Sequence, residues 1–172
     1  MAKTLIAFFS HAGENYVGGS VRFLERGNNE VIVDKIKALL PDADVFRIET
    51  VKNYKEDYYE LIEEAKQELR SKARPELTAK VENMDQYDTI YLGWPCWWGT
   101  YPMCVATFLE AHDWKGKTVI PFTTHEGSGF GQSLRDLKAA IPGATITKGL
   151  SIQGSKVGTA GNQIENFVTG GK

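Results

Sequence analysis

The sequence carries two adjacent tryptophans within a short segment, Gly93–Pro102 (GWPCWWGTYP), that is also rich in glycine and proline. Glycine and proline at both ends of this segment predict a loop rather than a strand or a helix. Neighbouring side chains of an extended loop point in opposite directions, so Trp97 and Trp98 are not expected to turn into the core together. An indole is costly to leave in water, and its flat face stacks well on other planar rings. The segment therefore predicts a binding site for a flat ligand.

A second loop that could do chemistry, Ser10–Gly13 (SHAG), directly follows an apolar run near the start of the chain. Ser10 offers a hydroxyl group, and Gly13 allows a ligand to approach the backbone closely. Backbone N–H groups in such a loop, together with a helix N-terminus, can hold an anion. The loop contains no lysine or arginine and matches neither the Walker A pattern nor G-x-G-x-x-G. It favours a single phosphate group held by neutral dipoles over a triphosphate with its metal ion.

The third loop of interest is Thr123–Ser133 (TTHEGSGFGQS), in which glycines are interleaved with small hydroxyl residues. Thr124, His125 and Ser128 add polar side chains between flexible backbone positions. Such a loop can surround the edge of a ligand with backbone N–H groups and hydroxyls. We therefore expect it to contribute to the same kind of site.

The elements that must position these loops can be read from the hydrophobic pattern, because short apolar runs predict strands and amphipathic runs predict helices. The predicted strands are Leu5–Phe9, Asp44–Ile48, Thr89–Leu92, Thr118–Phe122 and Ala144–Ile152. The predicted helices are Asn29–Leu40, Asn53–Arg74, Pro102–Ala111, Ser133–Ile141 and Asn162–Val168. Their regular alternation favours an α/β fold with a doubly wound, five-stranded parallel sheet in the order 2-1-3-4-5 and helices on both faces.

In an open sheet of that order, ligands bind beyond the carboxyl ends of the strands, at the switch point between the first and third strands. The three loops should converge there. Two stretches do not fit the simple alternation. Residues 14–27 interrupt the link from the first strand to the first helix, and residues 75–87 form a long polar approach to the third strand.

Length and composition exclude several classes of protein. A chain of 172 residues predicts a single domain that spans residues 1–172. The net charge of −2 and the scattered basic residues predict no nucleic-acid partner. No apolar run is long enough for a membrane span or a secretory signal, so we expect a cytoplasmic protein with no membrane partner. Cys96 and Cys104 form no metal or redox spacing and are expected to be reduced thiols.

Other chemistries that use an open α/β sheet need residues that this chain lacks. A phospho-receiver domain needs an aspartate after the third strand, where this chain has Gly93 and Trp94. A phosphatase of the Cys-x5-Arg kind needs a cysteine where Ser10 stands, and a Ser-His-acid hydrolase needs a G-x-S-x-G segment, which is absent. The three histidines lie far apart and form no metal-ligand spacing. We predict no catalytic side chain and no metal site.

The second and third loops together resemble those of flavodoxins, and the resemblance extends over essentially the whole chain. Gly93–Gly99 is similar to the G-x-P-x-W-W-G pattern of bacterial flavodoxin-like proteins. Phe122–Gly129 is similar to the F-x-T-x-x-G-S-G pattern of the same family. The resemblance implies a flavodoxin-like fold and a non-covalently bound FMN, whose ring would lie between these two loops.

The first loop departs from the family pattern S-x-T-G-N-T. Here Ser10–Gly13 is followed by the insertion at 14–27, and a second segment, Gly27–Asn29, then begins the helix. Ala12 and Asn29 stand where the family has threonines, so two hydroxyl donors are missing. We hypothesise that the phosphate site is split between the two segments, with backbone N–H groups or Asn15 in place of the missing hydroxyls.

The resemblance assigns Trp98 as the indole that stacks on the flavin and Trp97 as a side wall or core anchor. It also places a backbone group of Trp98-Gly99 near the flavin N5 atom. The residues expected to contact FMN are Ser10, His11, Ala12, Gly13, Asn15, Asn28, Asn29, Pro95, Cys96, Trp97, Trp98, Gly99, Thr124, His125, Glu126, Gly127, Ser128 and Gly129.

Three functions remain open from the sequence. The first is an electron-transfer flavoprotein that serves a redox partner protein or a small electron acceptor. The second is an NAD(P)H-dependent quinone or nitro-compound reductase that uses FMN, in which residues 14–27 and 75–87 build a substrate pocket or a homodimer surface. The third is a binding module that has lost FMN, which the altered phosphate loop allows.

Overall fold

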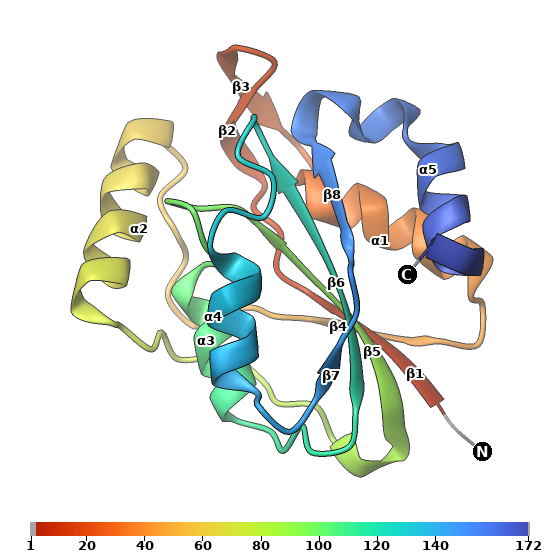
Figure 1. The fold of residues 1–172 in the computed structure, drawn as a ribbon. Coiled ribbons are helices and arrows are strands. Elements are labelled where there is room, and N and C mark those ends of the chain that lie inside the picture. The colour runs from red at the N-terminus through yellow and green to blue at the C-terminus, as the bar shows by residue number, and fades with distance from the viewer. Residues whose placement is uncertain (1–2, 172) are drawn as a thin grey trace.

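The computed structural model describes residues 3–171, and within them six strands form the central parallel sheet. They are β1 (Lys3–Phe8), β4 (Asp44–Arg47), β5 (Tyr87–Pro95), β6 (Thr118–His125), β7 (Thr145–Ile146) and β8 (Leu150–Gln153). The order is β4-β1-β5-β6-β7, and β8 also pairs with β6 (Figure 1). The carboxyl ends of β1, β5 and β6 therefore lie side by side at one edge.

The prediction of five strands in the order 2-1-3-4-5 needs correction, because the segment Ala144–Ile152 forms two short strands rather than one. The backbone N–H of Thr147 donates to Val119 O, and the next bond of a parallel ladder would come from the N–H of residue 121. That residue is Pro121, which has no N–H to donate. The ladder stops there and resumes where Phe122 pairs with Leu150.

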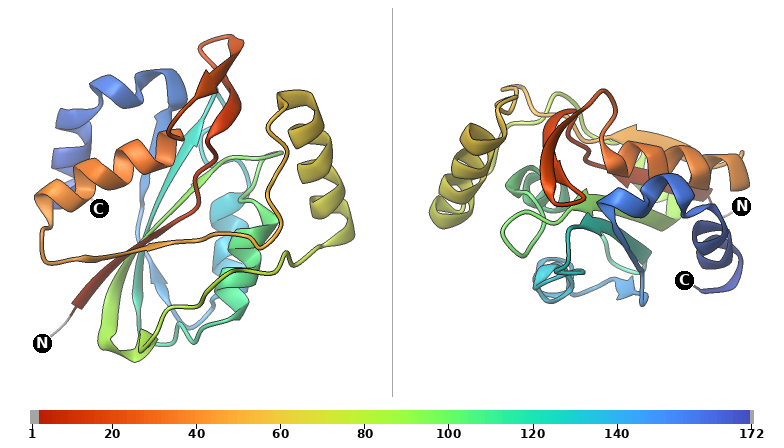
Figure 2. Two further views of the ribbon diagram at one scale, coloured as in Figure 1. Left: turned by 180° about the vertical axis from the view of Figure 1, so that it is seen from behind. Right: turned by 90° about the horizontal axis from the view of Figure 1, so that it is seen from above.

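Helices cover both faces of the sheet, as the alternating pattern predicts (Figure 2). One face is covered by α1 (Asn28–Leu39) and α5 (Gly161–Asn166). The other is covered by α3 (Met103–Glu110) and α4 (Ser133–Ala140). A further helix, α2 (Tyr58–Ser71), packs beside α3. Short helical turns at Met84–Gln86, Gly154–Thr159 and Phe167–Gly171 complete the chain.

The second helix is shorter than predicted, since α2 begins at Tyr58 rather than near Asn53. Asp57 caps it, because the Asp57 carboxylate accepts a hydrogen bond of 2.9 Å from the Glu60 N–H. The residues before the cap form a loop, and Tyr54 in that loop packs against the core. None of the helices described is long and apolar enough to cross a membrane.

The insertion after β1 is a β-hairpin that the sequence analysis did not predict. Its strands are β2 (Gly13–Val17) and β3 (Ser20–Leu24), joined by Gly18 and Gly19. Both glycines have positive φ, which is the conformation that a tight two-residue hairpin turn requires. The hairpin stands at the carboxyl edge of the sheet and not within it (Figure 1).

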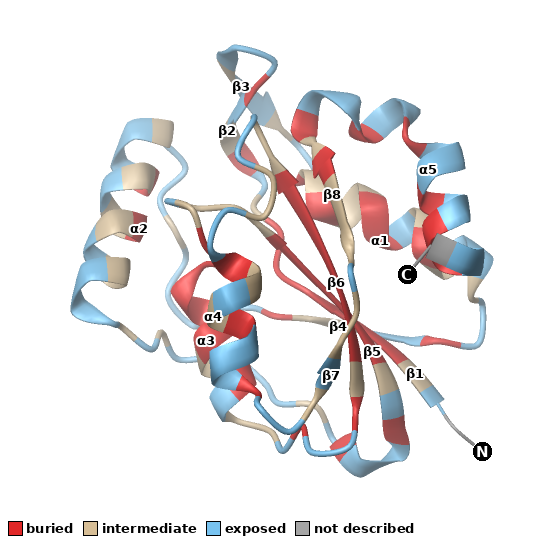
Figure 3. Cartoon of the chain, in the orientation of Figure 1, coloured by how far each residue is buried: buried red, intermediate tan, exposed pale blue. Residues whose placement is uncertain are grey.

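Two apolar layers, one on each face of the sheet, form the core (Figure 3). The polar stretch at 75–87 lies along one of these layers. Leu77, Val81, Met84 and Tyr87 from that stretch pack against the core. This stretch therefore completes the packing of that layer. In the same region, Thr50 and Leu77 form an isolated antiparallel β-bridge.

Replacing Gly93 with alanine should destabilise the protein, because Gly93 lies against the buried ring of Phe122. An added Cβ would overlap that ring, with Cδ2 at only 2.8 Å. We expect the free energy of unfolding to fall by about 1–3 kcal/mol, as measured by urea denaturation. The matched control is Gly161→Ala at the start of α5, where an added Cβ meets no atom within 4 Å. Equal loss of stability in both variants would contradict the packing described for Gly93.

Candidate functional site

A cavity of about 300 Å³ opens at the carboxyl ends of β5 and β6, between the hairpin, α2 and the loops that follow the two strands. It is the place where the three loops of interest converge. Its lining comes from the second and third loops, the start of α1, the hairpin, Gly154 and one side of α2, and Ser10–Gly13 contributes no lining residue. The lining residues are Asn15, Tyr16, Asn28, Tyr58, Leu61, Ile62, Ala65, Pro95, Cys96, Trp97, Trp98, Thr124, His125, Glu126 and Gly154.

Half of the residues expected at the site line the cavity itself. They are Asn15, Asn28, Pro95, Cys96, Trp97, Trp98, Thr124, His125 and Glu126. The others belong to the same loops without lining the cavity. They are Ser10, His11, Ala12, Gly13, Asn29, Gly99, Gly127, Ser128 and Gly129. Ser10, Gly13 and Asn29 are buried.

The two halves of the split first loop lie directly against each other. Gly27 packs on Ser10 and His11 so closely that an added Cβ would come within 2.7 Å of His11 O. The Ser10 hydroxyl oxygen accepts a hydrogen bond of 3.2 Å from the Glu30 N–H in the first turn of α1. Gly27 provides no side-chain cap for this helix of 12 residues. The first N–H groups of α1 therefore face the region beside Ser10 with their positive partial charge.

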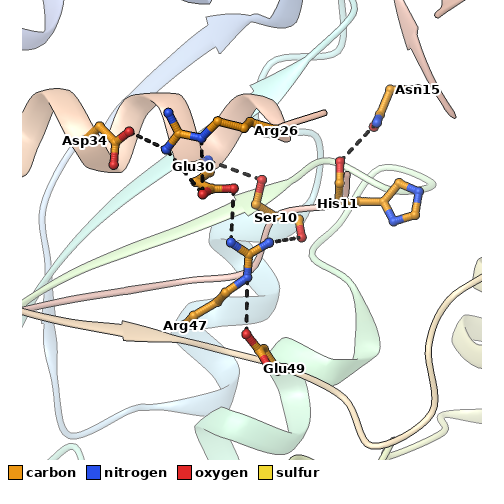
Figure 4. A network of polar contacts seen from close by, with 8 residues as sticks. All are labelled: Ser10, His11, Asn15, Arg26, Glu30, Asp34, Arg47 and Glu49. Atoms are coloured by element: carbon orange, nitrogen blue, oxygen red, sulfur yellow. Dashed lines mark hydrogen bonds and ion pairs between the residues drawn. The ribbon is translucent and has the colours of Figure 1, made fainter. Parts of the chain in front are cut away.

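Two arginines lie near the first loop, although Ser10–Gly13 itself contains none, and one of them contacts it (Figure 4). Arg47, at the end of β4, donates to Ser10 O at 3.4 Å and forms an ion pair of 3.0 Å with Glu30. Arg26 pairs with Glu30 and with Asp34. Burial alone would raise the pKa of Glu30, but its hydrogen bond and charge interaction with Arg47 lower that pKa below its ordinary value. The arginines are thus largely neutralised by acidic partners, and neutral dipoles remain the main feature of the loop.

The second loop turns sharply at Trp98 and Gly99. Trp97 and Thr100 exchange two backbone hydrogen bonds, of 2.8 and 3.2 Å, across the turn. Trp98 has φ +54° and Gly99 has φ +82°. A positive φ is natural for glycine but strained for tryptophan, and such strain is concentrated at functional sites.

The two tryptophans occupy different environments. The Trp98 side chain is 50% exposed, its indole N–H donates to Ile62 O at 2.8 Å, and the Lys66 ammonium lies 5.5 Å from its ring centroid. Trp97 is half-buried and packs edge-on against Phe9, Tyr54 and His11. Trp98 therefore presents a ring at the mouth of the cavity, while Trp97 forms a wall anchored in the core.

The third loop is tied to both of the others through Thr124. The Thr124 hydroxyl accepts a buried hydrogen bond of 2.9 Å from the Asn29 side chain, and Thr124 O accepts one of 2.8 Å from the Cys96 N–H. Further along, the Ser128 hydroxyl donates to Cys96 Sγ at 3.4 Å. The three loops form one connected unit.

Glu126 links the third loop to the hairpin, since its Oε2 accepts a hydrogen bond of 3.2 Å from the Gly18 N–H at the hairpin tip. The root of the hairpin is held by α2, because Glu14 Oε2 accepts a hydrogen bond of 2.7 Å from the Tyr58 N–H. Asn15 donates to His11 O at 3.0 Å. The hairpin is therefore fixed at both ends and supplies Tyr16 to the cavity lining.

Several buried polar atoms at this site have no partner. Among the described residues, five buried side-chain nitrogen or oxygen atoms lack a hydrogen bond, and His11 Nε2, Asn29 Oδ1 and Glu126 Oε1 are three of them. Buried polar groups are almost always satisfied in folded proteins, so this concentration is consistent with a polar ligand. Burial lowers the pKa of His11 and of His125, which favours neutral imidazoles at neutral pH. Residues 3–171 contain no cluster of His, Cys, Asp and Glu that could hold a metal ion.

The sequence analysis missed the wall that α2 and the hairpin contribute. Leu61 and Ala65, the buried residues of α2, line the cavity. Tyr16 and Tyr58 lie against each other with ring centroids 6.0 Å apart. The Gly18-Gly19 pair was the available signal for the hairpin, because consecutive glycines between strand-forming residues predict a tight turn.

Comparisons with known proteins agree with this architecture. The chain is similar in structure to a provisionally assigned flavoprotein from Bacteroides uniformis, with 29% identity and a TM-score of 0.73, over 95% of this chain and 98% of that one. A second such protein, from Bacteroides eggerthii, shares 27% identity with a TM-score of 0.72, over 96% of this chain and 99% of that one. A flavoprotein from Lactobacillus acidophilus, solved in complex with FMN, shares 18% identity with a TM-score of 0.68, over 92% of this chain and 98% of that one. No curated protein matches the chain.

The family comparison covers most of the sequence. The model of the flavodoxin family matches residues 20–169, which include the second and third loops and the helix-start segment of the first. The fold places these segments around one cavity at the carboxyl edge of the sheet. The chain belongs to the flavodoxin family.

Proposed function

We propose that this protein binds FMN non-covalently in the cavity and acts as an electron carrier. The observation that carries the proposal is the meeting of the helix-start half of the first loop, the tryptophan loop and the glycine-rich loop around one cavity, beside the start of α1 where Gly27 offers no side-chain cap. A helix N-terminus without a side-chain cap favours a phosphate group. Trp98 offers a ring face to a flat ligand.

The residues present fit the three parts of FMN. Ser10–Gly13 and Gly27–Asn29 would hold the phosphate with backbone N–H groups. Glu126 lines the cavity, and its unpartnered Oε1 is an acceptor, which suits the hydroxyl donors of a ribityl chain. Trp98 and the other lining residues of the second loop would contact the isoalloxazine ring. FMN supplies the redox chemistry when bound, and the protein tunes it by stacking, hydrogen bonding and nearby charge.

The size of the cavity favours a carrier over a reductase. A cavity of about 300 Å³ is at the lower end of the range for small-molecule sites, roughly 300–1,000 Å³. A flavin ring would fill most of it, which favours a protein that needs no second site for a flat substrate inside the cavity.

The decisive experiment is a titration of the purified protein with FMN, followed by absorption and fluorescence. We expect one FMN per chain, a shifted flavin spectrum and quenched flavin fluorescence, because the ring leaves water and stacks on an indole. The loaded protein, once chemically reduced, should pass electrons to cytochrome c but should not turn over NAD(P)H with a quinone. Failure to bind FMN would favour the binding-module alternative. Steady NAD(P)H oxidation with a quinone would instead favour the reductase.

Replacing Asn28 with alanine tests the split phosphate site. Asn28 lines the cavity at the start of α1, so its side chain is available to the phosphate end of the ligand. We expect FMN to bind more weakly by about 1 kcal/mol, which is roughly fivefold in Kd, while riboflavin binding is unchanged because riboflavin has no phosphate. Asn162→Ala, on the exposed side of α5, is the matched control and should bind both flavins as the wild type does. Equal weakening of FMN and riboflavin by Asn28→Ala would argue against a phosphate contact there.

Replacing Trp98 with alanine tests the stacking role of the exposed indole. Loss of one stacking contact should weaken FMN binding by about 1 kcal/mol or more, because aromatic pairs contribute energy beyond their buried area. Riboflavin should be affected to the same degree, since it carries the same ring. Tyr59→Ala, an exposed aromatic on α2 that does not line the cavity, serves as the control. Unchanged FMN affinity in Trp98→Ala would show that this indole does not stack on the flavin.

A further inference from the structure

Tyr54 and Glu68 form a hydrogen-bonded pair that none of the proposed binding contacts uses. Tyr54 lies in the loop before α2, and its phenol donates a hydrogen bond of 2.8 Å to Glu68 Oε1. Both side chains are half-buried. Burial raises the pKa of Glu68, which makes its carboxylate a stronger base toward the phenol. Burial also raises the pKa of Tyr54, so the resting phenol keeps its proton.

The same tyrosine touches the wall of the cavity. The rings of Tyr54 and Trp97 meet edge-on, with centroids 5.2 Å apart and an interplanar angle of 83°. Trp97 lines the cavity on its other side. Its other ring contacts among the described residues are Phe9 and His11, so Tyr54 is the one phenol whose ring packs against it there. Contacts therefore run from the cavity to Trp97, from Trp97 to Tyr54 and from Tyr54 to Glu68.

This arrangement meets the chemical requirement for oxidising a tyrosine. A phenol that loses an electron becomes a strong acid, so its oxidation is feasible only where a base takes the proton at the same time. A base must lie within about 2.6–3.2 Å of the proton donor to do so, and Glu68 does. The edge contact with Trp97 supplies the route for the electron.

We propose that Tyr54 is a redox-active tyrosine that repairs an oxidised Trp97. A one-electron oxidant in the cavity, such as a photoexcited flavin or an inorganic radical, removes one electron from Trp97. Tyr54 then gives one electron to the Trp97 radical cation, which still holds its indole proton, and gives its own phenolic proton to the Glu68 carboxylate, so the indole is restored and a neutral tyrosyl radical remains. A small reductant such as ascorbate returns one electron to Tyr54, which recovers the proton from Glu68.

This role protects the cavity, because the oxidising equivalent leaves the wall that faces the ligand. Trp97 also packs on Phe9 and His11, so permanent oxidation of its ring would disturb the first loop as well. Tyr54 moves the damage to a site that a soluble reductant can repair.

Pulse radiolysis of the cofactor-free protein tests the proposal without reference to FMN, so its failure is distinct from failure of the proposed function. Azide radicals oxidise indoles in preference to phenols at neutral pH. The background is Trp98→Phe, because Trp98 is 50% exposed and would otherwise intercept the radicals, whereas Trp94 and Trp114 are buried. We expect the tryptophan radical to decay while a tyrosyl radical grows, at a rate independent of protein concentration.

Two variants in this background locate the electron donor and the proton acceptor. Tyr54→Phe keeps the ring packing but removes the phenol, and it should abolish the concentration-independent growth of the tyrosyl radical. Glu68→Gln keeps a hydrogen-bond acceptor but removes the base, and it should slow that growth by on the order of a hundredfold, the lower end of what a positioned base contributes.

Tyr59→Phe, which removes an exposed phenol from α2, is the matched control and should leave the kinetics unchanged. Near-ultraviolet circular dichroism confirms that each variant is folded. Unaltered radical transfer in Tyr54→Phe would overturn the proposal, and an unaltered rate in Glu68→Gln would overturn the role of Glu68.

Discussion

The buried hydrogen bond from Asn29 to the Thr124 hydroxyl is the interaction on which the site depends. It joins the start of α1 to the end of β6, two segments separated by most of the chain. Gly27 packs on Ser10 and His11 on one side of this bond, and Cys96 bonds to Thr124 O on the other. A polar bond of this kind is strong because it is shielded from water, and it would be costly to leave either partner unpaired. The three loops therefore hold one another in place before any ligand arrives.

The electrostatics of the first loop follow from burial and pairing rather than from the number of charges. Arg47 reaches the loop from β4, but its charge is matched by Glu30, and Arg26 is likewise matched by Glu30 and Asp34. What remains unmatched is the partial positive charge of the first turn of α1. A monophosphate is suited to such a site because it needs several N–H donors and only a modest positive field.

The hairpin changes the shape of the site without entering the sheet. Its root is held by α2 through Glu14 and its tip by Glu126, so Tyr16 is carried over the cavity opposite the tryptophan loop. The aromatic walls then differ in rigidity. Trp97 is fixed among Phe9, Tyr54 and His11, whereas Trp98 is half exposed on a strained turn. This pairing of a fixed wall with an exposed ring explains how the cavity can be preformed at one side and open at the other.

The sequence by itself determined the features that arise from local chemistry. Apolar runs located the central strands, and glycine and proline placed the loops around Ser10, Trp98 and Thr124, because backbone preferences act over a few residues. Only the tertiary structure decided what depends on distant partners. Pro121 breaks the last strand only because Thr147 lies beside it, with a backbone carbonyl that needs an N–H donor. The helix α2 becomes a cavity wall only because the hairpin and Trp98 form hydrogen bonds with it. Hydrogen bonds and packing between segments far apart in the chain leave no periodic signal in the sequence, so the part of the cavity lining that comes from α2 and from Tyr16 could not be read from it.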